Sequence, residues 1–211
     1  MFPKNNLFCN TAHILPSLRQ QQLQPNLEAN YMVHSDLVEQ CKANDRRAQL
    51  QLYRQYCDGM FCVAMRFLNN ENDAEDVLQE AFIKAFQKLE QFRGDVTFGA
   101  WLKRIVINKC IDFIKSKKVQ YVELKEHTLR IADDEDWKVD DGISVEDVKA
   151  AMARLPDKYR FVLQMYLVEG LDYQEISGIL GLGESTCRTR LMRGRGLLKE
   201  LLKNAHYGTG S

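Results

Sequence analysis

The sequence predicts an all-α protein built from two small helical domains. From about residue 35 to residue 204, apolar residues recur at the i, i+3, i+4, i+7 spacing of helices, and strand-like alternation is almost absent. A strongly acidic stretch interrupts this pattern, and a helix, a glycine turn and a second helix follow near the C-terminus. We therefore expect one domain over residues 35–118, an acidic flexible linker over residues 119–143 and a helix-turn-helix domain over residues 144–204.

The composition is that of a soluble globular protein: of 211 residues, 45% are hydrophobic and 27% are charged. No apolar run approaches the roughly 20 residues that span a bilayer, and the N-terminus lacks the apolar stretch of a secretory signal. A cytoplasmic location without membrane insertion is therefore expected. The six cysteines form no C-x-x-C pair and have no histidine at ligand spacing, so we expect no metal, cofactor or disulfide framework.

The net charge is zero, but the charges are segregated along the chain. Residues 103–118 carry six basic side chains against one acidic one, and residues 184–203 carry six against two. Between these blocks, residues 133–147 carry eight acidic side chains against one basic one. Each basic block therefore remains a candidate for binding nucleic acid, although the whole chain is neutral.

Both ends of the chain are expected to lie outside the fold. Residues 1–34 hold three of the four prolines and a glutamine cluster without sustained periodicity, which is typical of a disordered tail. The alternative is an over-long start, because Met32 just precedes the first well-patterned helix. Residues 205–211, which end in Gly-Thr-Gly-Ser, form a second tail.

In the first domain, an initial helical region begins at about residue 35. Its apolar positions are Leu37, Val38, Cys41, Leu50, Leu52, Tyr53, Tyr56 and Phe61. The strongest helical pattern runs from Asp73 to about Phe92, with Asn72 and Glu75 as the expected capping box. After a turn, a further helix is predicted over residues 98–117.

In the second domain, the pattern predicts four helices, over residues 144–155, 156–169, 172–180 and 184–203. Asp172 and Glu175 form a capping box for the third helix. The glycine turn at residues 181–183 then leads into the last helix, which is the arrangement of a helix-turn-helix.

The last helix has a core face and an opposite basic face. The core positions are Cys187, Leu191, Leu198 and Leu201. The residues placed to reach base edges are Ser185, Arg188, Thr189, Met192 and Arg193. The flanking residues, better placed for phosphates, are Arg190, Arg195 and Lys199. The alternative is a solvated basic face without a ligand. Gly194 and Gly196 weaken this helix unless another backbone approaches closely.

The helix predicted over residues 98–117 carries a polar stripe that includes one aromatic ring. Its members are Trp101, Arg104, Asn108, Asp112 and Lys115. A basic stripe with an aromatic ring is typical of surfaces that hold single-stranded nucleic acid, and Phe98 is a second aromatic candidate. The alternative is that Trp101 packs against a neighbouring helix, while Asp112 pairs with Arg104 or Lys115.

The helix predicted over residues 73–92 exposes one apolar residue among polar ones. Ile83 shares its polar face with Asp76, Gln79 and Glu80, which indicates a protein partner, although single exposed hydrophobic residues are common. The acidic residues at the start of this helix match the helix dipole, and no histidine accompanies them. We therefore expect no catalytic residue.

Two sets of motifs resemble the second and fourth conserved regions of bacterial sigma-70 family sigma factors. The first set comprises Asn72–Phe82, Phe98–Leu102, Ile105, Asn108 and Asp112. The second set comprises Leu155-Pro156, Tyr159-Arg160, Glu169–Ile176, Leu180-Gly181 and Thr186–Leu191. The short chain, with little between the two sets, resembles the extracytoplasmic-function (ECF) subgroup. The departures from the family pattern are Gly183 at a capping position, Cys187 in place of valine, and an arginine-free end at residues 115–118.

The resemblance implies a non-enzymatic subunit that binds core RNA polymerase, selects promoters and assists their melting. The residues that would dock on the clamp helices of the largest polymerase subunit are Asp76, Gln79, Glu80 and Ile83. Those that would engage the −10 region are Phe98, Trp101, Arg104, Asn108 and Lys115. The face of the last helix would bind the −35 element, and an anti-sigma factor, free or membrane-bound, is a further expected partner. The alternatives are a stand-alone helix-turn-helix regulator and an enzyme with a DNA-binding tail.

Overall fold

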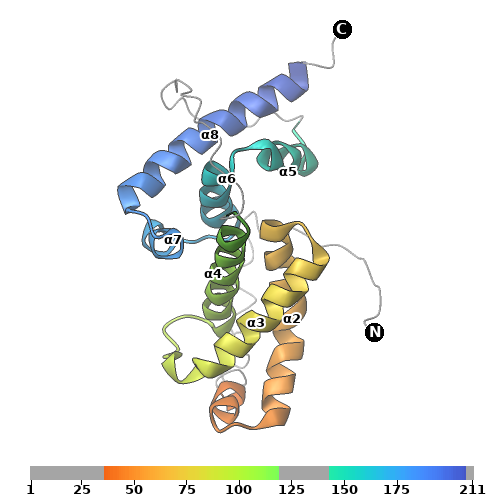
Figure 1. The fold of residues 1–211 in the computed structure, drawn as a ribbon, viewed down its shortest axis with the longest axis vertical. Coiled ribbons are helices and arrows are strands. Elements are labelled where there is room, and N and C mark those ends of the chain that lie inside the picture. Colours follow the sequence, from red (N-terminus) through yellow and green to blue (C-terminus); the bar gives the residue numbers. More distant parts are fainter. Residues whose placement is uncertain (1–35, 119–142, 208–211) are drawn as a thin grey trace, which may run out of the picture. The chain divides into compact units, whose positions relative to one another are not determined.

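The computed structural model describes residues 36–118 and 143–207, and within these ranges the chain forms helices and no strands (Figure 1). The chain divides into two compact units, the first ending at Gln120 and the second beginning at Tyr121. The predicted all-α class is therefore confirmed. The expected N-terminal tail and nearly all of the expected linker lie outside the described residues. The expected C-terminal tail begins too early, because residues 205–207 continue the last helix, and only residues 208–211 lie outside the described residues. In the part of the chain that is described, no helix is both long and apolar enough to cross a bilayer.

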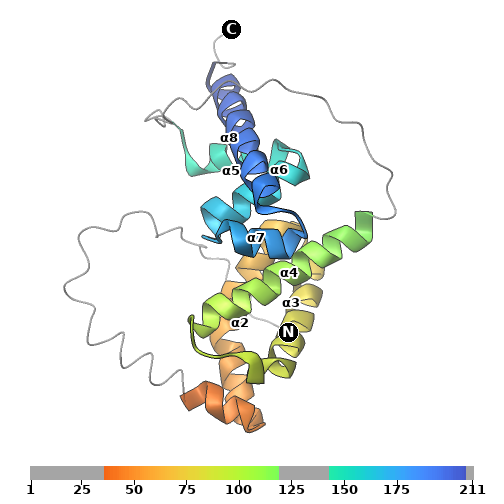
Figure 2. The same cartoon turned by 90° about the vertical axis from the view of Figure 1, so that its left-hand side faces the viewer.

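The first unit is a bundle of three long helices preceded by a short one. A helix over residues 36–42 is followed by the elements α2 (Arg46–Leu68), α3 (Glu71–Gln87), the 3-10 turn η1 (Leu89–Gln91) and α4 (Phe98–Lys118). Each of α2, α3 and α4 packs against the other two, as Figure 2 also shows. Their shared core includes Leu52, Ala64, Ala74, Ala81, Leu102 and Ile107, all fully buried.

The initial helical region is two helices and not one. Asn44 has a positive φ of 61°, and Asp45 caps α2 by accepting the backbone N–H groups of Arg47 and Ala48 at 2.7 and 3.3 Å. Of the apolar positions in this region, Leu50 is 48% exposed, whereas Ala48 and Leu52 are buried on the core-facing side of α2.

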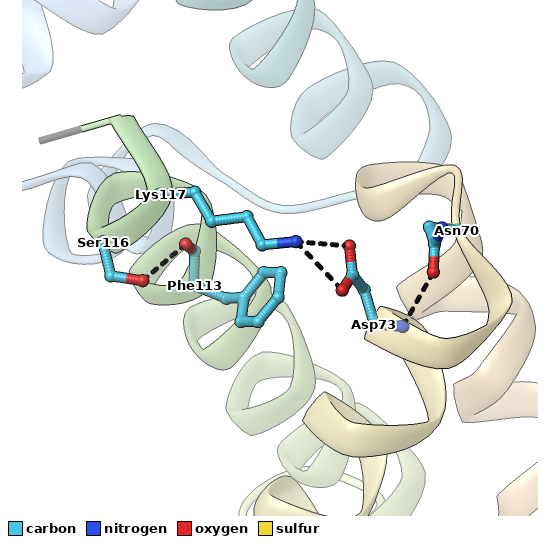
Figure 3. Close-up of polar contacts among 5 residues, drawn as sticks. All are labelled: Asn70, Asp73, Phe113, Ser116 and Lys117. Atoms are coloured by element: carbon cyan, nitrogen blue, oxygen red, sulfur yellow. Dashed lines mark hydrogen bonds and ion pairs between the residues drawn. The ribbon is translucent and has the colours of Figure 1, made fainter. Parts of the chain in front are cut away.

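Helix α3 begins two residues before its predicted start. Asn70 accepts the backbone N–H of Asp73 at 3.0 Å, so Asn70 is the cap and Asn72 lies inside the first turn (Figure 3). The expected capping box at Asn72 and Glu75 is therefore wrong. At its other end the helix stops at Gln87 and not at Phe92. There the backbone hydrogen bonds change from the i to i−4 pattern of an α-helix to the i to i−3 pattern of a 3-10 helix, and η1 begins.

Residues 143–207 of the second unit form four helices and one π turn. These are α5 (Val145–Arg154), α6 (Asp157–Leu163), the π turn η2 (Gln164–Val168), α7 (Tyr173–Leu180) and α8 (Glu184–Tyr207). The predicted capping box of α7 is confirmed, because Asp172 accepts the Glu175 N–H and Glu175 accepts the Asp172 N–H, both at 2.8 Å. Helix α8 packs along α5, α6 and α7 (Figure 2).

The helix predicted to run to about Glu169 is helical through Val168 and is followed by Gly170 with a positive φ of 70°. Its last part is the π turn, where the Glu169 N–H donates to the Gln164 carbonyl at 3.0 Å. One prediction for the last helix needs correction. In α8, Leu202 is buried and Leu201 is only half-buried. Leu202 follows Leu198 by four residues, which continues the core-facing side more closely than a three-residue step does.

Candidate functional site

The second unit presents an accessible polar face on α8, directly after the glycine turn. Gly181 ends α7 with a φ of +69°, and α8 starts three residues later. The exposed residues on its N-terminal half include Ser185, Arg188, Thr189, Met192 and Arg193. Cys187 and Leu191 are buried on the opposite side. The five side chains predicted to reach base edges are therefore all accessible, and Met192 is 55% exposed.

The three flanking basic residues are less accessible. Arg190, Arg195 and Lys199 are each half-buried. The Arg195 guanidinium carbon lies 5.8 Å from the centre of the Tyr166 ring, and its Nε atom is buried without a hydrogen-bond partner. Arg195 is thus held against the protein, in contrast to the exposed Arg193.

Two tyrosines beside this face were not identified as site residues from the sequence. The rings of Tyr166 and Tyr173 are stacked, with centres 5.0 Å apart and planes inclined by 27°. The Arg188 guanidinium carbon lies 5.0 Å from the centre of the Tyr173 ring. Burial, with a smaller contribution from Tyr166, raises the pKa of the Tyr173 hydroxyl. The tyrosines come from η2 and α7, so the periodicity of α8 holds no signal for them.

The polar stripe on α4 is accessible at its far end. Asn108 and Lys115 are exposed, whereas Trp101 and Arg104 are half-buried. The side-chain amide of Asn108 donates to the Arg104 backbone carbonyl at 3.0 Å, which holds it along the helix. The four residues fall on one side of α4, as the helical spacing requires.

Trp101 takes part in an aromatic cluster, as the alternative interpretation expects. Its ring centre lies 5.5 Å from that of Phe92 and 5.6 Å from that of Phe98. Phe98 also packs edge-on against Tyr56 of α2 at 5.2 Å and is only 5% exposed. The expected contact of Phe98 with a base is therefore not available in this structure, because the ring fills the space between α2 and α4. Trp101 keeps part of its surface accessible.

The predicted protein-binding residues share one exposed face of α3. These residues are Asp76, Gln79, Glu80 and Ile83. Ile83 is 58% exposed, as its position among polar residues predicts. Glu80 Oε2 lies 2.8 Å from Lys109 Nζ of α4, so this face adjoins the α4 surface through an ion pair.

A second ion pair joins the same two helices at the start of α3. Lys117 Nζ lies 2.8 and 3.0 Å from the two carboxylate oxygens of Asp73, and 4.5 Å from the centre of the Phe113 ring (Figure 3). The two ion pairs thus join α3 and α4 at two levels along α3, and they place the predicted protein-binding and nucleic-acid-binding residues on neighbouring helices.

These features define a class of protein: a two-unit helical protein whose C-terminal unit is a helix-turn-helix with an accessible basic recognition helix. Residues 52–119 match the family model of Sigma-70 region 2, and residues 146–198 match that of Sigma-70, region 4. The chain therefore belongs to the sigma-70 family. The match over residues 52–119 accounts for α2 to α4, which a stand-alone helix-turn-helix regulator leaves unexplained.

The relatives specify the subgroup. The chain is 32% identical to the ECF RNA polymerase sigma factor SigW of Bacillus subtilis (strain 168), over 79% of this chain and 95% of that protein. It is 29% identical to the ECF RNA polymerase sigma-E factor of Escherichia coli (strain K12), over 75% of this chain and 88% of that one. The chain is thus an ECF sigma factor, a protein of promoter-specific initiation by RNA polymerase.

Two solved structures share the fold. The first is CnrH in complex with the cytosolic domain of CnrY, with a TM-score of 0.51 and 24% identity over 81% of this chain and 97% of that one. The second is the sigma factor RpoE of Bartonella quintana in complex with the anti-sigma factor NepR, with a TM-score of 0.50 and 23% identity over 72% of this chain and 95% of that one. Both likenesses concern the fold.

Proposed function

We propose that residues 143–207 of this sigma factor read the −35 element, while residues 36–118 bind core polymerase and the −10 element. The observation that carries the proposal is the accessible face of α8, with Arg188, Thr189, Met192 and Arg193 directly after a capped helix and a glycine turn. In a helix-turn-helix the N-terminal half of the second helix reaches base edges. Arg188 and Arg193 act on bases, and Lys199 acts on phosphates.

The −10 contacts are proposed to come from Trp101, Arg104, Asn108 and Lys115. Support comes from their common side of α4 and from the partly accessible Trp101 ring, since aromatic side chains stack on unpaired bases. Phe98 is not included. As a buried ring it supports Trp101 from beneath.

The polymerase-docking face is proposed to be Asp76, Gln79, Glu80 and Ile83 of α3, directed at the clamp helices of the largest subunit. An exposed isoleucine ringed by polar side chains is suited to the centre of a protein interface with a polar rim. The chain acts in the cytoplasm as a non-catalytic subunit. An anti-sigma factor is proposed as its regulator, in line with the complexes formed by the two structural neighbours.

The experiment is retention of core polymerase by the tagged full-length chain, followed by in vitro transcription from a genomic library of the source bacterium. We expect the chain to retain polymerase and to yield transcripts whose start sites share two upstream elements. Core polymerase without the chain is the control. Binding of DNA without retention of polymerase would support the stand-alone regulator instead.

A further inference from the structure

Two arginines of α8 enclose a pair of stacked tyrosines. Arg188 lies over the Tyr173 ring at 5.0 Å, Tyr173 stacks on Tyr166 with centres 5.0 Å apart, and Arg195 lies over Tyr166 at 5.8 Å. Seven residues of helix make nearly two turns and rise about 10 Å, so Arg188 and Arg195 lie on the same side of α8. The two rings fill the interval between the two guanidinium groups.

The loop between η2 and α7 brings the two tyrosines together. The Leu171 N–H donates to the Met165 carbonyl at 3.0 Å, which closes this loop, and Leu171 is itself buried. The capping box of Asp172 and Glu175 then fixes the first turn of α7, where Tyr173 is the first residue. These backbone contacts fix the loop and the first turn of α7, from which the two rings extend.

A guanidinium stacked on a ring keeps its hydrogen-bonding capacity. The cation uses its flat face for the aromatic contact, while its N–H donors point outward in the plane of the group. An arginine side chain otherwise loses rotamer entropy when a contact fixes it. Stacking on Tyr173 therefore restricts Arg188 before DNA arrives and leaves its donor edge available for a bidentate contact.

We infer that the Tyr166–Tyr173 pair is a positioning platform that orients Arg188 for its base contact in the −35 duplex. Tyr173 and Tyr166 are positioning residues, because they act through Arg188. Arg195 contacts Tyr166, the other ring of the stack, which accounts for its half-buried position. In this inference Arg195 supports the two rings and does not contact a phosphate. This inference rests on the proposed function, since it requires Arg188 to contact a base.

The experiment measures binding of holoenzyme, formed from full-length variants and core polymerase, to promoter fragments selected by the wild-type holoenzyme. Each fragment carries one base-pair substitution in the −35 element. Arg188→Ala is expected to lower discrimination about 5- to 150-fold at one base pair. Tyr173→Leu should lower discrimination about two- to fivefold at the same base pair. Tyr173→Phe keeps the ring and should retain this discrimination. The double variant, Tyr173→Leu with Arg188→Ala, should lose no more discrimination than Arg188→Ala alone.

The outcomes separate the platform from the proposed function. If Arg188→Ala leaves the profile unchanged, the base contact of Arg188 is absent and the platform has no role. Suppose that Arg188→Ala changes the profile but Tyr173→Leu weakens binding to all fragments alike. The base contact of Arg188 then stands and the platform is refuted. The platform is also refuted if the losses of discrimination from Tyr173→Leu and Arg188→Ala add in the double variant. If Tyr173→Leu does not fold, the NMR signals of the Arg188 guanidinium in the wild-type protein test the platform. Ring-current shifts of these signals would support contact with Tyr173, and their absence would overturn the platform.

Discussion

Gly194 of α8 lies so close to Leu163 of α6 that a side chain does not fit between the two helices. A Cβ atom at residue 194 would be 2.8 Å from Leu163 Cδ1, 3.0 Å from Leu163 Cγ and 3.3 Å from Tyr159 Cβ. Leu163 is fully buried, so its side chain has little room to move. A close approach therefore exists at Gly194, but its contacting atoms belong to side chains of α6 and not to another backbone.

Gly194→Ala is expected to destabilise the protein. Overpacking a core costs about 1–3 kcal/mol, and the better helix propensity of alanine offsets about 1 kcal/mol, which leaves a net loss of up to about 2 kcal/mol. Gly178 of α7 has nothing within 4 Å of its Cβ position, so Gly178→Ala is a matched control and should stabilise by up to about 1 kcal/mol. Urea unfolding followed by circular dichroism measures both. Equal stability of the two variants would contradict the close contact.

The cap of α3 is tested by two neighbouring asparagines. Asn70→Ala removes the side-chain acceptor of the Asp73 N–H and should lower the free energy of unfolding by about 1 kcal/mol. Asn72 is exposed inside the helix, so Asn72→Ala should be neutral or slightly stabilising. Urea unfolding of the two variants decides between the two candidate caps. If Asn72→Ala were the more destabilising variant, Asn72 would be the cap and the helix start predicted from the sequence would be correct.

Local chemistry explains which features were predictable. The capping box of Asp172 and Glu175 involves residues three apart, so the sequence alone contains it. At α3 the same rule fits two registers, because Asn70 precedes Asp73 and Asn72 precedes Glu75 by three residues each. Packing of the whole helix against α2 and α4 selects the first register, and a single-sequence pattern does not contain that information.

The aromatic residues show the corresponding limit for the candidate site. Phe98 is the first residue of α4, and its ring packs against Tyr56, which is 42 positions earlier in the chain and on another helix. Arg188 and Tyr173 likewise meet only after the second unit has folded. The exposure of five residues on the N-terminal half of α8, by contrast, follows from the helical period alone.

The α3 face is tested against a control in the same unit. Glu80→Lys with Ile83→Asp should lower affinity for core polymerase about tenfold or more, because truncating interface centres costs upwards of 1 kcal/mol. Stability should change by less than about 1 kcal/mol, since Glu80 and Ile83 are both exposed and Glu80 forms only a partly solvent-accessible ion pair with Lys109. Leu50→Asp alters a comparably exposed apolar residue on α2 and should leave affinity unchanged. Equal losses for both variants, or unfolding of the double variant, would refute the docking face.

Cys41 makes stability depend on alkaline pH. Burial, reinforced by the Asp45 carboxylate, raises the pKa of the Cys41 thiol from 9.0 to about 11. As the pH rises, this thiol ionises in the unfolded chain at a lower pH than in the folded protein. Its contribution to the free energy of unfolding is therefore complete below pH 9 and is lost as the pH rises toward 11. Cys41→Val should therefore show a shallower loss of stability over this interval than the wild type. Urea unfolding across the interval measures the slopes, and identical slopes would show that Cys41 does not contribute.

Arg193 and Lys199 test base contact against phosphate contact on the same helix. Arg193 is exposed near the N-terminal half of α8, whereas Lys199 lies six residues further along and is half-buried. Removing a base contact costs about 1–3 kcal/mol and relaxes the preference at one base pair. Removing a phosphate contact weakens all sequences alike and lowers the salt slope by about one unit.

Arg193→Ala should therefore flatten the −35 binding profile at particular base pairs, while Lys199→Ala should lower the whole profile without changing its shape. The measurement is holoenzyme binding to single-substituted promoter fragments at several salt concentrations. Ser185→Ala, on the same accessible face but without a charge, is the control for the salt slope. A profile that Arg193→Ala merely lowers, with a salt slope reduced as for Lys199→Ala, would assign Arg193 to the phosphate backbone and remove it from base recognition.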